Sequence, residues 1–375
     1  MKTVLVGIPC LLVGGTEIQT LRLVEALVSG GYRVVTVCYF EYNAQMVNNY
    51  KIAGSEVICL SAYGRRPEVK KQRKFLYQGL RRVVKEYHPG IAHIQYMAPG
   101  ALPILILRRL GVKTIVATTH TNADIYKNLR LVHFIEKHIT KVFTCVSQSA
   151  EMSFFGSSQC YDDKMALQKH NHLTIYNGIK LDSYRDYQPK TISDTPVIGF
   201  VARMEKIKGA DLVLPAFSKL LAAHPECRLK IVGDGSLCEM MQEQQKSLQI
   251  PNEKVEWLGR VNASSLPSLY RHMDIVWCPS RSEGFGLTAV EAMASGVVVV
   301  ASNIGSHKEI IQTEDDAVGI LVTPESPDSI SDATCRLLEN NDLYCELSRK
   351  GMERVQSFSN EQYANNVLSL YKKLC

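Results

Sequence analysis

The feature that most constrains the fold is a regular alternation of short apolar strands and amphipathic helices. Residues 2–8 form a β-branched run typical of a strand, residues 18–29 gather apolar side chains on one helical face, and residues 34–37 are strand-like again. Two strands joined through a helix need a crossover connection and therefore lie parallel. The same unit recurs as far as residues 319–322, so the sequence predicts an α/β fold with parallel sheets.

Length and charge indicate two domains. A chain of 375 residues can bury two cores, and a polar stretch over residues 182–196 suits a linker. Residues 1–180 carry 23 Lys and Arg against 11 Asp and Glu, whereas the remainder carries 20 against 26. We therefore predict a basic domain over residues 1–185, an acidic domain over 186–358 and a terminal helix over 359–375, with the two domains facing different partners.

The segment 282–300 has the pattern of an anion-binding turn. Gly284 and Gly286 permit a tight approach to a helix over residues 287–294, and a helix start offers N–H groups and a positive dipole end to a phosphate. Glu291, about two turns into the helix, could accept hydrogen bonds from ribose hydroxyls. Glu283 lies on the other side of the phosphate position. The site residues predicted in this segment are Glu283, Phe285, Gly286, Leu287 and Glu291.

A second cationic turn follows the strand predicted over residues 197–201. Arg203 and Lys208 are five residues apart in a turn that ends at Gly209. A planar guanidinium combined with a lysine point charge suits a diphosphate. We expect this pair to act as a diphosphate clamp.

These motifs together resemble a known family. The run from Glu283 to Gly296 is similar to the Glu-x7-Glu signature of retaining glycosyltransferases of family 4. Arg203 to Gly209 resembles the Gly-Arg-x4-Lys-Gly element of that family, with Ala202 in place of the first glycine, and Gly14-Gly15 resembles its first glycine loop. The motifs stand in the family's order along nearly the whole chain. The resemblance implies a GT-B fold, with two doubly wound Rossmann-like domains and an active site in the interdomain cleft.

The resemblance also implies roles for particular segments. The first domain would bind the acceptor, the second the nucleotide-sugar donor, and the terminal helix would cross back to the first domain. His120, just past a central strand, would contact the sugar, while Arg260 and Val261 would lie near the base. The implied catalytic residues are Glu283, His120, Arg203 and Lys208; the implied donor-binding residues add Gly14, Gly15, Arg260, Val261, Phe285, Gly286, Leu287 and Glu291.

The implied activity is transfer of a sugar, with retention, from a UDP-sugar or GDP-mannose to a glycan or lipid-linked acceptor in surface polysaccharide or glycoconjugate biosynthesis. A nucleotide-sugar epimerase, a phosphorylase or a non-catalytic nucleotide-sugar-binding protein are the alternatives. The sequence contains no Asp-x-Asp motif for a metal, so we expect no metal and no other cofactor. No nucleic-acid-binding motif accompanies the positive charge of the first half.

Residues 67–87 form an amphipathic helix with an unusually basic face, beginning at Pro67 as a favoured first helical residue. Its apolar stripe comprises Val69, Leu76, Leu80, Val83 and Tyr87, and its opposite face comprises Lys70, Lys71, Lys74, Arg81, Arg82 and Lys85. The simpler interpretation is an ordinary solvated helix face. We predict instead weak binding to an anionic membrane, with the protein cytoplasmic and peripheral on the inner face of the cell membrane.

Overall fold

The computed structural model describes residues 2–97, 99–126, 128–184, 186–312 and 316–374. The chain divides into two compact units, which we call unit 1 (Met1–Gly178 with Asn360–Cys375) and unit 2 (Ile179–Ser359). Residue 185, where the sequence places its domain boundary, lies outside the described residues. Within the described ranges, none of the helices has the length and apolar character needed to cross a bilayer.

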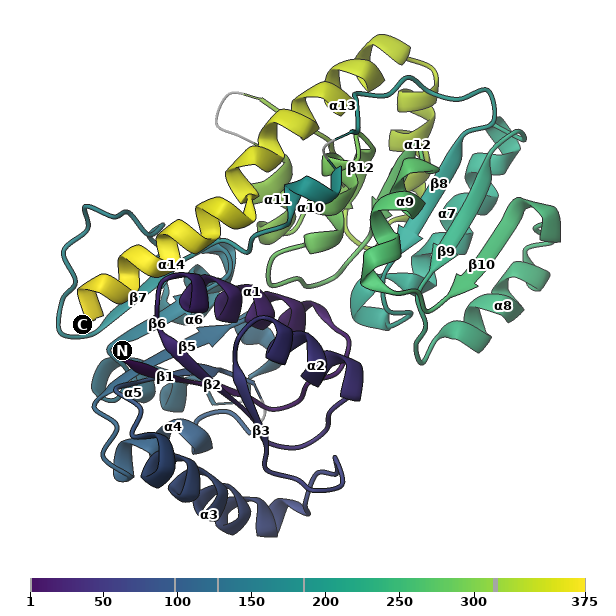
Figure 1. Cartoon of the computed structure of the whole chain (residues 1–375). Helices are drawn as coiled ribbons and strands as arrows, with labels where there is room; N and C mark the ends of the chain where they lie inside the picture. Colours follow the sequence, from purple (N-terminus) through teal and green to yellow (C-terminus); the bar gives the residue numbers. More distant parts are fainter. Residues whose placement is uncertain (1, 98, 127, 185, 313–315, 375) are drawn as a thin grey trace. The chain divides into compact units, whose positions relative to one another are not determined.

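Unit 1 is built on a seven-stranded sheet whose strand order is β3-β2-β1-β4-β5-β6-β7, with every neighbouring pair parallel (Figure 1). The chain starts in the middle and winds outward in both directions, which is the doubly wound arrangement. The strands are β1 (Thr3–Ile8), β2 (Arg33–Cys38), β3 (Glu56–Cys59), β4 (Ile91–Gln95), β5 (Thr114–Thr119), β6 (Val142–Cys145) and β7 (Asn171–Thr174).

Helices cover both faces of this sheet, because successive side chains of each strand point to opposite sides. In β1, Leu5 joins the core beneath α3 to α6, whereas Val4 and Val6 join the core beneath α1, α2 and α14. The terminal helix α14 therefore packs on unit 1, beside α1. The helices are α1 (Gly15–Ser29), α2 (Ala44–Ile52), α3 (Val69–Tyr87), α4 (Leu102–Arg109), α5 (Leu129–His138), α6 (Gln148–Phe155), α14 (Asn360–Leu374) and the short η1 (Ala123–Ile125).

Unit 2 repeats the design with six parallel strands in the order β10-β9-β8-β11-β12-β13. One face carries a continuous core in which strand residues meet α7, α8, α12 and α13. The strands are β8 (Val197–Val201), β9 (Arg228–Val232), β10 (Val255–Gly259), β11 (Ile275–Cys278), β12 (Val298–Ser302) and β13 (Ile320–Val322). The helices are α7 (Ala210–Ala223), α8 (Cys238–Ser247), α9 (Leu266–Arg271), α10 (Leu287–Ala294), α11 (Gly305–Ile311), α12 (Pro327–Leu338), α13 (Asn341–Arg354) and the short η2 (Leu181–Tyr184), η3 (Lys206–Lys208), η4 (Asn252–Lys254), η5 (Ala263–Ser265) and η6 (Val355–Phe358).

The two doubly wound parallel sheets confirm the predicted fold class, and solved GT-B structures described below share it. The basic helix departs from its prediction in two details. It begins at Val69 rather than Pro67, and Val69 is 83% exposed instead of buried. The predicted apolar stripe is buried only from the second turn onward, at Leu76, Leu80 and Val83, where α3 reaches the strands and α4.

Candidate functional site

The turn between β8 and α7 is held by two glycines that no other residue can replace without strain. Gly209 has a φ of +70°, and a Cβ there would lie 2.1 Å from the carbonyl oxygen of Pro279. Gly233 has a φ of +133°, and a Cβ there would lie 1.9 Å from the carbonyl oxygen of Ala202. The approach at Gly209 holds the turn that carries Lys208 against the loop after β11, which carries Glu283, and the approach at Gly233 holds the loop after β9 against the end of β8.

Lys208 and Glu283 form an ion pair at the carboxyl edge of the unit 2 sheet. Lys208 Nζ lies 2.5 Å from Glu283 Oε1, and Ser280 Oγ donates to the same oxygen at 2.9 Å. The side chain of Glu283 is only 16% exposed. Burial favours the protonated acid, but the charge of Lys208 and the hydrogen bonds from Lys208 and Ser280 outweigh it, so the pKa of Glu283 is lowered. The carboxylate is therefore ionised at neutral pH.

Lys208 and Glu283 line a small cavity, which is also lined by the beginning of α10 and by a buried histidine. Gly286 caps α10 with a φ of +112°, and Thr288 Oγ1 donates to the Val201 carbonyl at 3.0 Å, which fixes the first turn of the helix to β8. His307, at the start of α11, packs against Gly286 and donates from Nδ1 to the Ser302 carbonyl. Burial lowers the pKa of His307, so its imidazole is neutral beside the Lys208–Glu283 pair.

The other predicted residues of unit 2 are not all directed into this cavity. Arg203 is exposed and lies outside the cavity lining. The ring of Phe285 is buried edge-to-face on Phe358, with centroids 5.4 Å apart, so its side chain has a packing role. Glu291, further along α10, accepts a hydrogen bond from the buried Tyr270 hydroxyl at 3.2 Å.

Three further predicted residues lie in two backbone segments of unit 2. Leu287 is the first residue of α10 and is partly exposed. Arg260 and Val261 form the turn after β10, where Arg260 is exposed and Val261 partly exposed. Both segments lie beyond the carboxyl ends of parallel strands, which is where open α/β sheets bind ligands.

In unit 1, the glycine loop leads directly into α1. Gly14 caps the helix in an extended conformation, and Gly15 is its exposed first residue. A Cβ at Gly14 would lie 2.6 Å from Glu17 Oε2. The loop therefore approaches the carboxylate of Glu17, which is favourably placed in the first helical turn.

His120 follows β5 at the carboxyl edge of the unit 1 sheet. Its Nε2 lies 2.6 Å from Oε1 of Gln95, the last residue of β4. His120 remains partly exposed, yet its dense surroundings lower its pKa to about 4 by desolvation. The imidazole is therefore neutral near pH 7 and can only exchange hydrogen bonds there. The polar side chains of Gln19, Thr144 and Asn177 line the same cavity.

Sequence reasoning missed three neighbours of the predicted residues: Ser280, His307 and Gln95. Each stands at the carboxyl end of a parallel strand or in the segment that follows it. That position is a usable signal, because the carboxyl ends of neighbouring parallel strands meet at one edge of the sheet. The same signal applies to Lys208 and Glu283, which are 75 residues apart in sequence but follow the neighbouring strands β8 and β11.

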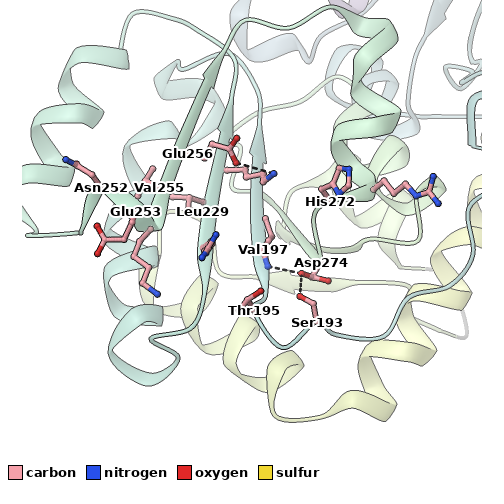
Figure 2. Close-up of a pocket in the computed structure, with 14 residues that line it drawn as sticks. Ser193, Thr195, Val197, Leu229, Asn252, Glu253, Val255, Glu256, His272 and Asp274 are labelled. Carbon is pink, nitrogen blue, oxygen red and sulfur yellow. Dashed lines mark hydrogen bonds and ion pairs between the residues drawn. The ribbon is translucent and has the colours of Figure 1, made fainter.

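Unit 2 also has a larger cavity, of about 670 Å³, at the opposite edge of its sheet (Figure 2). Its lining includes Val197, Arg228 and Val255, which are the first residues of β8, β9 and β10. Asp274 in this cavity accepts hydrogen bonds from Ser193 Oγ and Val197 N, each at 2.8 Å, as the dashed lines in Figure 2 show. Because Asp274 is used to anchor the linker and β8, we place the candidate ligand site at the Glu283 edge instead.

Family models match both units of the chain. Residues 13–157 match the model described as Glycosyltransferase Family 4, and residues 185–354 match the model described as Glycosyl transferases group 1. The first match lies within unit 1, and the second lies within unit 2. The two matched segments follow one another along the chain, in the same order as units 1 and 2.

Individual relatives extend this similarity to full length. An uncharacterized glycosyltransferase of Methanocaldococcus jannaschii is 28% identical over 97% of this chain and 95% of its own. A D-inositol 3-phosphate glycosyltransferase of Segniliparus rotundus is 31% identical over 76% of this chain and 66% of its own. The crystal structure of Anabaena HepE in complex with UDP and glucose superposes with a TM-score of 0.81 at 17% identity, over 99% of this chain and 100% of that one. That last similarity establishes the fold.

Proposed function

Because the chain is a GT-B glycosyltransferase with a family 4 region followed by a group 1 region, we propose that it transfers a sugar from a UDP-sugar to an acceptor with retention of configuration. The observation that carries this proposal is the Lys208–Glu283 pair at the start of α10. It combines a cation, a helix N-terminus and an ionised carboxylate within one small cavity. Those groups match the charges that develop when a sugar leaves a diphosphate.

The reaction breaks the anomeric C–O bond to the phosphate and forms a C–O bond to the acceptor hydroxyl. The hydroxyl proton passes to the leaving phosphate, so the charges balance. Positive charge grows on the sugar ring in such a transition state, and negative charge grows on the phosphate. Lys208, Arg203 and the N–H groups at the start of α10 would stabilise the phosphate, and the ionised Glu283 would stabilise the ring and hold its hydroxyls. Attack on the face that the phosphate leaves would give retention.

The remaining predicted residues would bind parts of the donor that do not react. Glu291 would accept hydrogen bonds from the ribose, and the backbone of the turn at Arg260 and Val261 would lie near the base. Gly14 and Gly15 would approach the phosphates through exposed backbone at the start of α1. The neutral imidazole of His120 would exchange a hydrogen bond with a sugar hydroxyl.

We propose that the reaction needs no divalent metal. The sequence has no Asp-x-Asp motif, and the turn before α7 supplies two positive charges, the partly buried Lys208 and the exposed Arg203. Preorganised charges of this kind stabilise a leaving group without reorganisation during the reaction.

UDP is the favoured carrier, and GDP is the alternative, as in GDP-mannose. The Anabaena HepE complex with UDP and glucose supports a UDP-sugar, because its fold covers this whole chain. We propose a glycan or lipid-linked acceptor of a surface polysaccharide or glycoconjugate. The similarity to a lipopolysaccharide core mannosyltransferase of Rhizobium meliloti supports this class of acceptor, at 26% identity over 47% of this chain.

We further propose that α3 holds unit 1 at the cytoplasmic face of an anionic membrane. All six basic residues of the predicted face are exposed: Lys70, Lys71, Lys74, Arg81, Arg82 and Lys85. A groove of about 860 Å³ runs between α3 and α4, where Arg73, Lys74 and Arg109 surround Tyr77 and Leu105. Cations around an apolar floor complement phospholipids, which present phosphates above acyl chains.

Donor cleavage in the absence of acceptor tests the proposed activity. The purified protein is incubated with UDP- and GDP-sugars, and free nucleotide is measured over time. We expect slow release of UDP from one UDP-sugar, abolished in Glu283→Gln. Exchange of the sugar configuration without nucleotide release would favour an epimerase, and sugar phosphate formation from glycan and inorganic phosphate would favour a phosphorylase. Tight nucleotide-sugar binding without any turnover would favour a non-catalytic binding protein.

A further inference from the structure

The buried polar groups around His120 form an ordered arrangement on one face of the unit 1 sheet. Gln95 on β4 is the register partner of Thr118 on β5. His93 and Gln95 are two residues apart on β4, and Thr118 and His120 are two residues apart along β5 and its end, so each pair lies on one face. Gln95 is 2% exposed, and His93 is 5% exposed.

A neighbouring chain of hydrogen bonds runs from Tyr371 through His93, Thr118 and Thr144 to the Ala117 carbonyl. The donor of each bond can be assigned by starting at that carbonyl, which can only accept. Thr144 Oγ1 donates to the Ala117 carbonyl, so Thr118 must donate to Thr144 and in turn accept from His93 Nε2. His93 Nδ1 is then left to accept from the Tyr371 hydroxyl of α14. His93 is thus held neutral with its proton on Nε2, because the Thr118 Oγ1 atom accepts a hydrogen bond from that nitrogen.

The same reasoning applies to His120. The Oε1 atom of Gln95 can only accept a hydrogen bond, so the Nε2 atom of His120 at 2.6 Å must carry the proton. Desolvation lowers the pKa of His120 to about 4, which keeps the ring neutral at pH 7. A neutral ring with hydrogen on Nε2 has its lone pair on Nδ1.

Gln95 is itself unusual, because its amide nitrogen is buried and has no hydrogen-bond partner among the described residues. A buried amide left without a partner costs on the order of 1–3 kcal/mol. Its side chain lines the cavity that His120 also lines. An apolar residue at this position would avoid that cost, but it could not accept the hydrogen bond that Gln95 Oε1 accepts from His120.

We propose that Gln95 is a positioning residue that fixes His120 in the Nε2–H tautomer, so that Nδ1 accepts a hydrogen bond from a hydroxyl of the transferred sugar. This inference rests on the role of His120 in the proposed function. It adds which ring nitrogen contacts the sugar and which residue determines it. His120 then selects sugars that present a hydroxyl donor at that position.

Histidine-selective ¹⁵N NMR of the protein without donor tests the tautomer directly. The His120 signals are assigned by their loss in His120→Gln. We expect Nε2 of wild-type His120 to show the shift of a protonated ring nitrogen and Nδ1 that of an unprotonated one, from pH 6 to 8. In Gln95→Leu the two tautomers should mix, whereas Thr144→Val, which changes the same cavity without touching His120, should leave the shifts unchanged.

Kinetics then separate positioning from simple packing. Gln95→Leu should lower kcat/KM about tenfold, the scale of one hydrogen bond. Gln95→Glu keeps an acceptor beside Nε2, so it should restore the tautomer and much of the activity above pH 8. Because a carboxylate raises the pKa of an adjacent imidazole, the acidic limb of the kcat/KM profile should move to higher pH in this variant.

Two results would overturn the inference: a wild-type His120 protonated on Nδ1, or unchanged His120 shifts in Gln95→Leu. Failure of the proposed function gives a different pattern. The Nε2–H tautomer would still be present in the free protein, and no UDP-sugar would be cleaved. If Gln95→Leu does not fold, the wild-type spectrum and the Gln95→Glu profile decide the matter alone.

Discussion

The two sheets end in the same kind of edge but carry opposite chemistry. At the carboxyl edge of unit 2, Lys208 and Glu283 form an ion pair, and the pKa of Glu283 is lowered despite its burial. At the carboxyl edge of unit 1, burial lowers the pKa of His93 to about 3 and that of His120 to about 4, so both rings are neutral. Fixed charge suits a diphosphate, whereas neutral donors and acceptors suit sugar hydroxyls. One architecture therefore supports two recognition chemistries through the residues that follow its strands.

The largest expected effect is the loss of turnover when a positive charge is removed from the carboxyl edge of unit 2. Lys208→Ala should lower kcat by about 10²-fold or more, the scale for losing one preorganised stabilising group. Arg203→Ala should cost less, about tenfold, because an exposed guanidinium is less preorganised. Lys206→Ala is the matched control, since it removes the same charge from the same turn. Steady-state donor turnover measures all three; near-normal rates for both Lys208→Ala and Arg203→Ala would place the clamp elsewhere.

The second prediction concerns the basic surface of unit 1. Replacing Lys70, Lys74, Arg81 and Lys85 by Gln should weaken binding to anionic liposomes on the order of 10²-fold at low salt, because each charge contributes up to about 1 kcal/mol at the membrane surface and less with distance from it. The control replaces Lys51, Lys113, Lys137 and Lys169, which are exposed in unit 1 but outside α3. Sedimentation with vesicles of increasing anionic lipid content measures binding. Equal binding to neutral and anionic vesicles would identify α3 as an ordinary solvated helix.

The third prediction assigns different roles to two glutamates, Glu291 in α10 and Glu283 in the loop before that helix. Glu291→Ala should weaken binding of free UDP about tenfold, the scale of hydrogen bonds to a charged group. Glu283→Ala should leave UDP affinity nearly unchanged and reduce transfer, because its partners Lys208 and Ser280 place it at the reacting sugar in our proposal. Calorimetry with UDP measures the first effect and turnover the second. Equal losses of UDP affinity would show that the two roles are assigned incorrectly.

The smallest expected effect is on stability in acid. The folded pKa of Glu283 lies below that of the unfolded chain, which is about 4.3 for glutamate. Its contribution to the free energy of unfolding is therefore complete above pH 4.3 and is lost as the pH falls through the folded pKa. Glu283→Gln should unfold with a shallower decrease in stability below pH 4.3. Urea titrations at several pH values measure the slope; identical slopes would mean that the pair does not stabilise the fold.

The fold could be predicted from sequence because its signals are local. The β-branched run over residues 2–8 predicted β1, and the helical spacing of apolar residues over 18–29 predicted most of α1. Helix α2 was not predicted, since Ala44–Ile52 is polar and has a weak apolar face. The burial of Val69 was predicted wrongly for a related reason: a helical wheel shows which residues share a face, but not where the neighbouring strands and α4 end.

The candidate site could be predicted only in part. Glycine spacing and charge identified Lys208, Glu283 and Gly286, and the structure brings these three to one cavity. The direction of the Phe285 ring depends on Phe358, which is 73 residues away and invisible to a local motif. His307 and Gln95 were missed because a single buried polar residue has no periodicity. Their roles follow from hydrogen-bond partners on other strands and loops, which only the folded chain reveals.

The central claim is that fixed charges of unit 2 stabilise the leaving diphosphate. It is tested most directly by measuring UDP release from the accepted UDP-sugar in excess EDTA, with wild-type protein and Lys208→Ala side by side. We predict that wild-type release is unchanged by EDTA and by added Mn²⁺, and that Lys208→Ala is slower by about 10²-fold in every condition. Wild-type release that disappears in EDTA and returns with Mn²⁺ would contradict the account.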